Sequence, residues 1–345
     1  MLKFTHWILA GSIFLISCSK KDSNPVPAPS NLVINATISI DSSGKVDFTA
    51  TASNAVTYFF DFGDGYTLES STGKVSHTFT LVGTHDYNIS VTAKGSTGLV
   101  YTGKKTISVI YKVPELKLVW FDEFDVNGKP DGSKWGYDIG TGSNGWGNNE
   151  LEYYTDRIEN AYIENGSLFV KAIKENFGGK AYTSARMLTK GKFEFSYGKV
   201  EVRAKLPSPI GTWPAIWMLG TDIGTVGWPA CGEIDIMEHR GSDINRIVAA
   251  LHYPGRSGGN PNSNTKLISN ATSEFHVYKL EWTQYEIKFS IDDVPFHTVV
   301  PSSSMPFYKN FFLLLNVAMG GTFGGDVDPA FTNAAMEVDY VRIYQ

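Results

Sequence analysis

The sequence has only two cysteines, Cys18 and Cys231, in 345 residues, which excludes a framework of several disulfides. Basic residues are too few to suggest a nucleic-acid partner, because 30 Lys and Arg stand against 35 Asp and Glu. No segment shows a convincing helical period of useful length. The apolar stretch at residues 4–16 is shorter than the roughly 20 residues that a membrane-spanning helix needs.

Aromatic residues and glycine, by contrast, are abundant. The chain is 42% hydrophobic and 13% aromatic, and it contains 34 Gly, 17 Tyr and 8 Trp. Runs of Thr, Ser, Asn and Tyr between turn residues favour strands over helices. A chain of this length is expected to form two all-β domains, and its aromatic rings suit both a β core and a groove that stacks on sugar rings.

The N-terminus has the features of an export signal. Lys3 supplies the positive charge, the apolar stretch at residues 4–16 follows, and the segment ends with the letters LISC at Cys18. A small residue before a lone cysteine resembles the bacterial lipobox, which implies that residues 1–17 are a lipoprotein signal peptide and that Cys18 carries the lipid. Residues 18–30 would then be a tether at the bacterial cell envelope, on the outer membrane or the cell surface. An ordinary signal peptide cut nearby is the alternative.

Residues 31–112 show short alternating runs separated by turn residues. The letters GDG at Gly63 to Gly65 mark a tight turn in which glycine supplies a positive φ. The blocks FDFGDG and HTFTLVGTHDYNISVTA, at their mutual spacing, resemble a PKD domain. The resemblance implies an immunoglobulin-like sandwich that serves as a spacer or weak binding module. Asp61 and Asp64 are expected to form turns, with a metal site as the alternative.

Residues 113–345 alternate more clearly. The stretch KGKFEFSYGKVEVRAKLP alternates apolar and charged residues as a strand does, and YEIKFSI is followed by the turn signal Asp292-Asp293. The continuous apolar run FFLLLNVAMGG predicts a strand that is covered on both faces. Two packed, curved antiparallel sheets, forming a β-jelly-roll sandwich, are therefore expected after the immunoglobulin-like domain.

Three carboxylates, Glu233, Asp235 and Glu238, lie close together in the segment GEIDIMEHRG. Alternation in a regular strand places Glu233 and Asp235 on one face and Glu238 on the opposite face, in the core. Burying an unpaired carboxylate is costly. We therefore expect a β-bulge at Ile236–Met237 that returns Glu238 to the face of the other two acids.

The bulge sets the separation of the two Glu side chains. Four effective strand steps of roughly 3.3 Å separate their Cα atoms by about 13 Å. If each side chain leans inward by about 4 Å, the carboxylates lie about 5 Å apart, which is the spacing of a retaining glycosidase. Asp235 between them raises the pKa of a neighbouring carboxyl. A calcium site and a solvated strand face are the alternatives.

The same segment resembles the signature of glycoside hydrolase family 16, Glu-x-Asp-x-x-Glu in its bulged form. The blocks GTWPAIWMLG, GWGNNELEYYT, YTSARM and MEVDYVRIYQ resemble the laminarinase-like branch of that family and span nearly all of residues 115–345. The resemblance implies an open cleft on the jelly roll and hydrolysis with retention of configuration. It also implies that Glu233 is the nucleophile, Asp235 its assisting acid and Glu238 the general acid/base. Geometry alone does not distinguish the two Glu.

Further residues are expected in the cleft. Two Trp in TWPAIWML share a strand face, and an indole suits a glucosyl ring, although Trp is usually a core residue. The Gly-rich loop GWGNNELEYY offers amides for sugar hydroxyls, unless its own Asn side chains satisfy the turn. An Arg and a His on strands beside the acids complete the set, although a lone His is often structural. The predicted substrate-binding residues are Trp213, Trp217, Trp228, Trp146, Asn148, Glu150, Arg186 and His252.

The resemblance also implies a structural calcium held by Glu123, the Gly166 carbonyl and Asp339. An ion pair between Asp339 and a surface Arg is the alternative. The chain departs from the family pattern at Thr322-Phe323, where many relatives carry Trp-Pro. That difference bears on subsite preference rather than on reaction type.

These expectations combine into one hypothesis of function. We expect a lipid-anchored, monomeric glycosidase that hydrolyses β-1,3-glucan of the laminarin type internally and uses no cofactor for catalysis. The alternatives are hydrolysis or transglycosylation of another β-glucan or galactan, and glycan binding without cleavage. Three mutually repelling charges at one site disfavour a pure binding protein.

Overall fold

The computed structural model describes residues 26–113 and 115–345 of the chain. Contacts between residues divide the chain into two compact units, with the boundary between Glu115 and Leu116. Each unit has its own hydrophobic core. The predicted signal peptide, Cys18 and most of the predicted tether lie outside the described residues. Within the described ranges, no helix has the length and apolarity needed to cross a bilayer.

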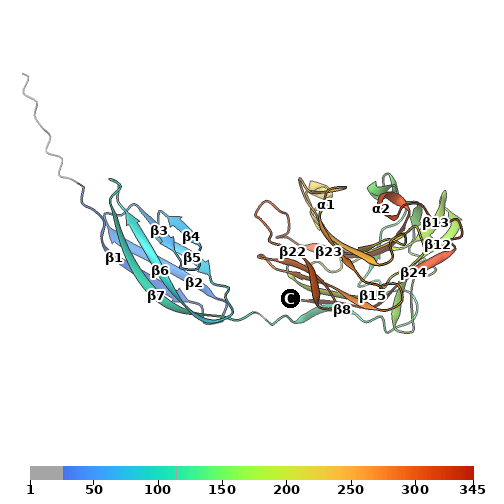
Figure 1. Ribbon diagram of the computed structural model, residues 1–345, viewed down its shortest axis with the longest axis horizontal. Coiled ribbons are helices and arrows are strands. Elements are labelled where there is room, and N and C mark those ends of the chain that lie inside the picture. The colour runs from blue at the N-terminus through green and yellow to red at the C-terminus, as the bar shows by residue number, and fades with distance from the viewer. Residues whose placement is uncertain (1–25, 114) are drawn as a thin grey trace, which may run out of the picture. The chain divides into compact units, whose positions relative to one another are not determined.

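The first unit is a sandwich of two antiparallel sheets (Figure 1). Alternate residues of the strands point inward, so that rings such as Phe48, Phe60 and Phe62 pack in the core. One sheet has the order β1 (Ser30–Ile38), β2 (Lys45–Ser53) and β5 (Lys74–Thr78). The other has the order β4 (Thr67–Ser70), β3 (Thr57–Asp61), β6 (Gly83–Lys94) and β7 (Val100–Tyr111).

The turn between β3 and β4 forms as the sequence predicts. Gly63 and Gly65 have φ angles of 77° and 94°, in the region that favours glycine. The Asp61 carboxylate accepts a hydrogen bond from the Gly63 N–H at 3.0 Å, and Asp64 accepts one from the Tyr66 N–H at 3.1 Å. Both Asp residues therefore act as turn formers, which confirms that expectation over the metal alternative.

The second unit is a β-jelly-roll of two packed sheets. Its ten-stranded sheet has the order β10 (Glu152–Tyr154), β13 (Lys180–Ser184), β12 (Ser167–Phe177), β24 (Asn333–Tyr344), β15 (Gly198–Lys205), β20 (His276–Trp282), β21 (Ile287–Ile291) and β22 (Val294–Val299), with β11 (Ala161–Glu164) beside β12 and β8 (Leu118–Asp122) beside β24. The seven-stranded sheet, called the site sheet below, has the order β19 (Asn262–Leu267), β18 (Arg246–His252), β17 (Glu233–His239), β16 (Thr212–Gly220), β23 (Phe311–Met319), β14 (Arg186–Leu188) and β9 (Gly136–Tyr137).

Three short helical turns accompany these sheets, namely η1 (Gly145–Asn149), α1 (Ile223–Val226) and α2 (Gly321–Gly324). Figure 1 shows α1 and α2 on the side of β23 that faces away from β15 and β8. The predicted all-β class and jelly roll are thus confirmed, with helix limited to single turns at the rim.

The main core lies between the two sheets. Leu313, Leu315 and Val317 of β23 and Val200 and Val202 of β15 are all buried in it. All nine residues of β23 are buried, so this strand is covered on both faces. The continuous apolar run predicted such a strand correctly, because a central strand has no solvated side.

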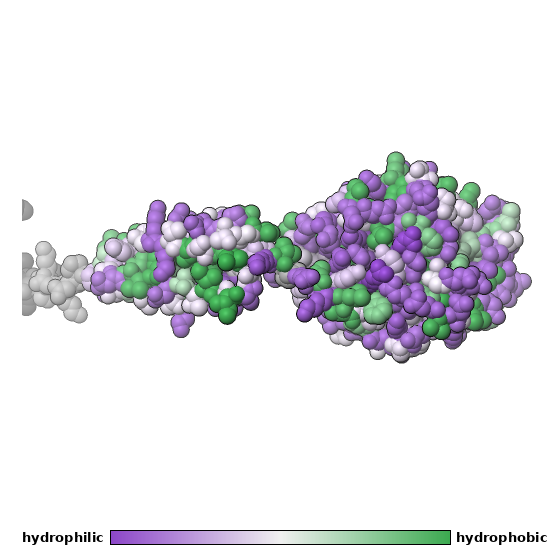
Figure 2. All heavy atoms as spheres, turned by 90° about the horizontal axis from the view of Figure 1, so that it is seen from below, coloured by the Kyte–Doolittle hydropathy of each residue, from purple (hydrophilic) through white to green (hydrophobic). Residues whose placement is uncertain are grey.

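The outer face of the ten-stranded sheet is charged. Glu201 on β15 pairs with Lys199 at 2.8 Å and with Lys279 on the neighbouring β20 at 3.4 Å. Lys205 pairs across to Glu337 on β24 at 2.6 Å. Figure 2 shows hydrophilic residues spread over the visible face of this unit, with hydrophobic side chains scattered among them. Alternation along β15 therefore separates an ion-paired surface from the core.

One predicted strand begins later than expected. The stretch KGKFEFSYGKVEVRAKLP reads as one continuous strand, but β15 begins only at Gly198, and Phe195 makes an isolated bridge to Phe311. Tyr197 and Gly198 have φ angles of 59° and 120°, so the backbone turns between the two halves. Phe193, Phe195 and Tyr197 all pack in or against the core, and of the three Phe195 alone pairs with a strand.

The core position of β23 predicts the effect of truncating it. We expect Leu315→Ala to lower the free energy of unfolding of this unit by about 2–5 kcal/mol, because a fully buried side chain leaves a cavity. Leu267→Ala on the edge strand β19 is the control, since that side chain is 64% exposed. It should change stability by less than about 0.5 kcal/mol. Urea unfolding followed by tryptophan fluorescence gives both values, and equal effects would contradict the assignment of the core.

Candidate active site

The three carboxylates lie on β17, in the middle of the site sheet between β16 and β18. Against β16, the pair Asp235–Trp217 is followed by the pair Met237–Ile216, so two steps of β17 lie opposite one step of its neighbour. Against β18, Asp235 pairs with Ala250 and Glu238 pairs with Val248, so three steps of β17 lie opposite two steps of β18. One extra residue in β17 is the definition of a β-bulge, and the predicted bulge is confirmed.

The bulge changes which side chains face the core. Ile236 and Met237 are successive residues, yet both are buried in the main core, with 1% and 0% of their surface exposed. A regular strand would have turned Met237 outward. Glu238 therefore returns to the face of Glu233 and Asp235, away from the core.

Each of the two Glu accepts a hydrogen bond from an indole. The Trp228 Nε1–H donates to Glu233 Oε2, and the Trp213 Nε1–H donates to Glu238 Oε1, both at 3.0 Å. Trp213 is buried on β16, whereas Trp228 is 47% exposed in the loop before β17. Each N–H stabilises the ionised form of its acceptor. Two of the tryptophans predicted to line the cleft thus contact the acids directly.

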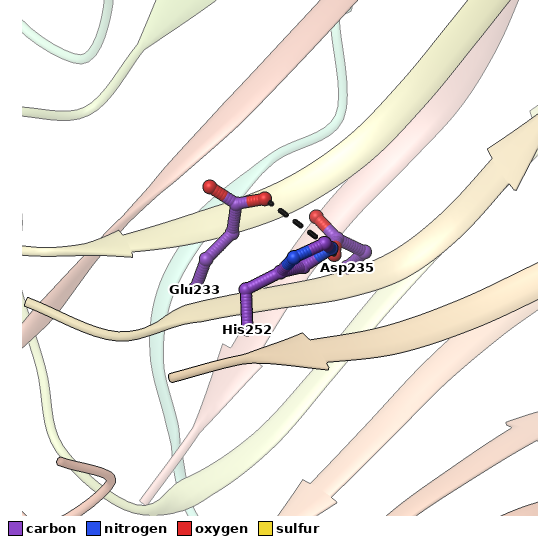
Figure 3. A group of neighbouring side chains, drawn as sticks. All are labelled: Glu233, Asp235 and His252. Carbon is purple, nitrogen blue, oxygen red and sulfur yellow. Dashed lines mark ion pairs between the residues drawn. The ribbon is translucent and has the colours of Figure 1, made fainter. Parts of the chain in front are cut away.

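His252 approaches the acids from β18. Its Nε2 lies 3.2 Å from Asp235 Oδ2 and 3.8 Å from Glu233 Oε1 (Figure 3). Its other nitrogen, Nδ1, accepts a hydrogen bond from the Gly258 N–H at 3.2 Å. In a neutral ring, the proton must therefore sit on Nε2, the ring nitrogen that lies nearer the two carboxylates.

The same three side chains offer donor atoms within 4.8 Å of one another, and in residues 26–113 and 115–345 no other such group of potential metal ligands occurs. A metal on Nε2 needs the lone pair of that nitrogen, which would move the ring proton to Nδ1, opposite the Gly258 N–H donor. Calcium would in addition prefer oxygen ligands. The hydrogen bond that His252 Nδ1 accepts from Gly258 thus fits a proton on Nε2 better than a metal ion there.

Burial raises the pKa of all three carboxyl groups. The pKa of Glu233 rises to about 8 through burial and then the charge of Asp235, while His252 opposes the rise. The pKa of Glu238 rises to about 8 for the same two reasons, and His252 and the Trp213 N–H oppose it. Burial also raises the pKa of Asp235 to about 8, against a hydrogen bond with Glu233. The cluster therefore retains protons near neutral pH, as a general acid requires.

Arg186 on β14 stands between two indoles. Its Cζ lies 4.4 Å from the centre of the Trp146 ring and 4.7 Å from that of Trp217. Its Nε–H donates to Asp138 Oδ2 at 3.0 Å. The Arg186 charge lowers the pKa of Glu233, against the effect of burial. The stack therefore holds a cation beside the acids.

Trp146 belongs to a left-handed turn. Asn144, Gly145, Trp146, Gly147 and Asn149 have φ angles of 52°, 56°, 54°, 84° and 58°. Such angles are costly for residues other than glycine, and strain of this kind is concentrated at functional sites. The predicted Gly-rich loop is thus present, and its backbone presents Trp146 to Arg186.

A chain of hydrogen bonds joins this loop to the site sheet. Asn148 Nδ2 and Tyr154 Oη donate to Glu150 at 3.2 and 2.9 Å. Asn316 Nδ2 donates to Tyr154 Oη at 3.0 Å, and Trp217 Nε1 donates to Asn316 Oδ1 at 2.8 Å. Glu150 is only 4% exposed and both its oxygens accept bonds from the protein, so it supports the cleft wall rather than offering a free acceptor.

Three residues of this site did not emerge from the sequence. Asn316, Tyr154 and Asp138 hold Trp217, Glu150 and Arg186 in place through the bonds described above. Asn316 had a visible signal, because it is the one polar residue in an otherwise apolar strand of nine residues. A buried amide needs a partner, and its partners lie on the cleft side.

The residues expected to hold calcium are engaged differently. Glu123 accepts two hydrogen bonds from Arg342, at 2.8 and 2.7 Å, and Asp339 accepts one from Arg203 at 2.6 Å. Gly166 lies in the turn between β11 and β12, with a φ of 78°. Because both carboxylates bind guanidinium groups, this arrangement does not fit a calcium site. Asp339 forms the ion pair that was the alternative.

Comparisons with known proteins agree with this geometry. Residues 145–342 match the Glycosyl hydrolases family 16, and residues 21–108 match the PKD domain. The chain is 43% identical over 251 residues to a beta-glucanase of Rhodothermus marinus, a match that covers 68% of this chain and 87% of the relative.

Two solved structures are similar to the second unit. The laminarinase catalytic domain from Thermotoga maritima superposes with a TM-score of 0.64 at 43% identity, over 67% of this chain and 99% of that one. LamAcat from Zobellia galactanivorans superposes with a TM-score of 0.61 at 46% identity, over 66% of this chain and 97% of that one. The bulged acidic strand, the jelly roll and these matches lead to one assignment: the chain belongs to glycosyl hydrolase family 16 and carries a PKD domain ahead of its jelly roll.

Proposed function

We propose that this protein is a retaining endo-hydrolase that cleaves β-1,3-glucan of the laminarin type. The observation that carries the proposal is the bulge in β17, which turns Glu233, Asp235 and Glu238 to one face of the site sheet. Similarity to laminarinases at 43% identity supports a glucan substrate. Trp228, which is exposed beside Glu233, supplies a ring on which a sugar can stack.

In the first step, a carboxylate oxygen of Glu233 bonds to the anomeric carbon. The bond from that carbon to the glycosidic oxygen breaks, and Glu238 gives its proton to the departing oxygen. The Trp228 N–H and the nearby Arg186 charge favour the anion at Glu233. Burial keeps the proton on Glu238. The products of this step are a free sugar end and an ester on Glu233.

In the second step, a water molecule attacks the same carbon. Its proton passes to Glu238, its oxygen bonds to carbon, and the Glu233 carboxylate departs. Asp235 lies beside His252 Nε2 and forms a hydrogen bond with Glu233. This hydrogen bond assists Glu233 as its charge is lost in the first step and regained in the second. This chemistry needs no cofactor, and every group comes from one chain, so the proposed site is complete in a monomer.

Substitution of the two Glu tests the proposal. We expect Glu238→Gln to lower kcat on laminarin by about 10²–10⁴-fold, since it removes the general acid. Glu233→Gln should abolish release of reducing ends, because no ester can form. Glu164→Gln, at an exposed position of β11, is the matched control and should retain activity.

The same assay uses mixed-linkage glucan, agarose and carrageenan to define the substrate. Full activity in Glu233→Gln, or no release from any of these polymers by the wild type, would refute the proposal. Binding to laminarin without release would identify a glycan-capture protein. Products larger than the substrate would identify transglycosylation.

We also propose that the protein is anchored in the bacterial cell envelope by a lipid on Cys18. The support is the sequence alone, a short apolar stretch that ends in LISC before a Pro-containing segment. Cells fed an alkyne-tagged fatty acid should label the wild type, which should partition into a detergent phase. Cys18→Ser should lose the label and remain aqueous, and equal behaviour of the two chains would refute the anchor.

A further inference from the structure

We propose that Phe323 is a positioning residue for Glu238 and that it acts through the indole of Trp213. The proposal rests on the proposed function, because that function assigns the proton transfer to Glu238. Phe323 lies in α2, the short helical turn that follows β23.

Phe323 packs directly on the indole that serves Glu238. The centres of the Phe323 and Trp213 rings lie 5.3 Å apart, with an angle of 50° between the ring planes. The Arg240 Cζ lies 5.3 Å from the centre of the same Phe323 ring. Phe323 is therefore held between an indole and a cation, both of which favour contact with an aromatic ring.

The backbone of α2 is fixed against the strand that carries Trp213. The Gly320 N–H donates to the Gly211 carbonyl at 2.7 Å. A Cβ built on Gly324 would lie 3.3 Å from the Trp213 Cβ, which shows how closely α2 approaches β16. Gly211 has a φ of 96° and would bring a Cβ within 2.5 Å of the Val327 Cα. This packing leaves Phe323 little freedom to move away from Trp213.

One hydrogen bond links the Trp213 indole, on which Phe323 packs, to Glu238. The Trp213 N–H lies on the indole edge and donates to Glu238 Oε1 at 3.0 Å, a distance that rotation of the indole would lengthen. Without the Phe323 ring, one face of Trp213 loses its packing partner, and the indole gains room to rotate. The hydrogen bond to Glu238 then weakens, although neither of its two groups has been altered.

Titratable and charged residues lie around Glu238, and the Trp213 N–H is the donor that binds its carboxylate. Glu233 and Asp235 lie on its own strand, His252 faces it from β18, and Arg240 follows at the end of β17. The Trp213 N–H stabilises the ionised form of Glu238, so weakening this bond favours the protonated form. Since the first step needs protonated Glu238, activity would persist to higher pH, while the weaker acid would transfer its proton more slowly.

The test compares pH profiles of kcat/KM on laminarin for the full chain and its Phe323→Ala variant. We expect the basic limb of the variant to move up by about 0.5–1 pH unit, a part of what complete loss of a hydrogen bond to a charged group would give. We expect kcat to fall by about 3–10-fold while KM changes by less than about twofold. Phe323→Tyr keeps the ring and should keep the wild-type profile. Phe296→Ala, a partly buried ring on β22, controls for truncation of a Phe elsewhere in the same unit.

A double substitution separates this role from a simple structural one. Trp213→Phe removes the N–H donor, so it should move the basic limb in the same direction. Phe323→Ala added to Trp213→Phe should then produce no further shift. The proposal is wrong if the Phe323→Ala profile superimposes on that of the wild type, or if the two shifts add in full. It is also wrong if KM rises with an unchanged limb, because Phe323 would then contact the sugar itself. These outcomes presuppose an active wild type, so they are distinct from failure of the proposed function.

Discussion

A carboxylate is costly to bury without a partner, and β17 runs through the middle of a sheet whose inner face buries Ile234, Ile236 and Met237 of this strand. Strand alternation would direct Glu238 into that core. The bulge at Ile236–Met237 avoids this cost by giving two successive apolar residues to the core and returning the acid to the other face. The site therefore depends on a backbone irregularity that is itself stabilised by hydrophobic burial. Burial of Ile236 and Met237 thus stabilises both the core and the arrangement of the acids.

Burial and hydrogen bonding have opposite effects on the pKa values of the three carboxyl groups. Burial alone would keep all three carboxyl groups protonated, and the neighbouring acids add to that effect. Hydrogen-bond donors oppose this protonation, because the Trp228 N–H binds Glu233 and the Trp213 N–H binds Glu238. The Arg186 cation also opposes the rise in the pKa of Glu233. Two chemically identical side chains thus acquire different surroundings, which is what a nucleophile and an acid need.

Much of this arrangement follows from local pattern. Alternation in the sequence predicts the jelly roll, the resemblance to a PKD domain implies the sandwich, and the cost of a buried Glu238 predicts the bulge. Contacts between distant segments do not follow in the same way. Asn316 and Tyr154 are 162 positions apart, and their bond forms only when β23 and β10 are brought together by the whole fold. The pairing of Glu123 with Arg342 is equally nonlocal, and the resemblance that implied calcium there gave no sign of it. In the Phe193–Tyr197 stretch, the alternation of aromatic residues predicted a strand, but β15 begins only at Gly198.

We propose that the bulge places Glu233 and Glu238 on either side of one glycosidic bond, close enough for a covalent intermediate. Carboxyl groups about 5–5.5 Å apart give retention of configuration, and a wider separation gives inversion. Proton NMR of laminarin hydrolysis, recorded in the first minutes before the anomers equilibrate, measures this outcome directly. If Glu233 and Glu238 act as a nucleophile and acid/base pair, we expect the new reducing ends to appear first as the β-anomer. First appearance of the α-anomer would mean that Glu233 and Glu238 do not act as a nucleophile and acid/base pair, and it would contradict the account.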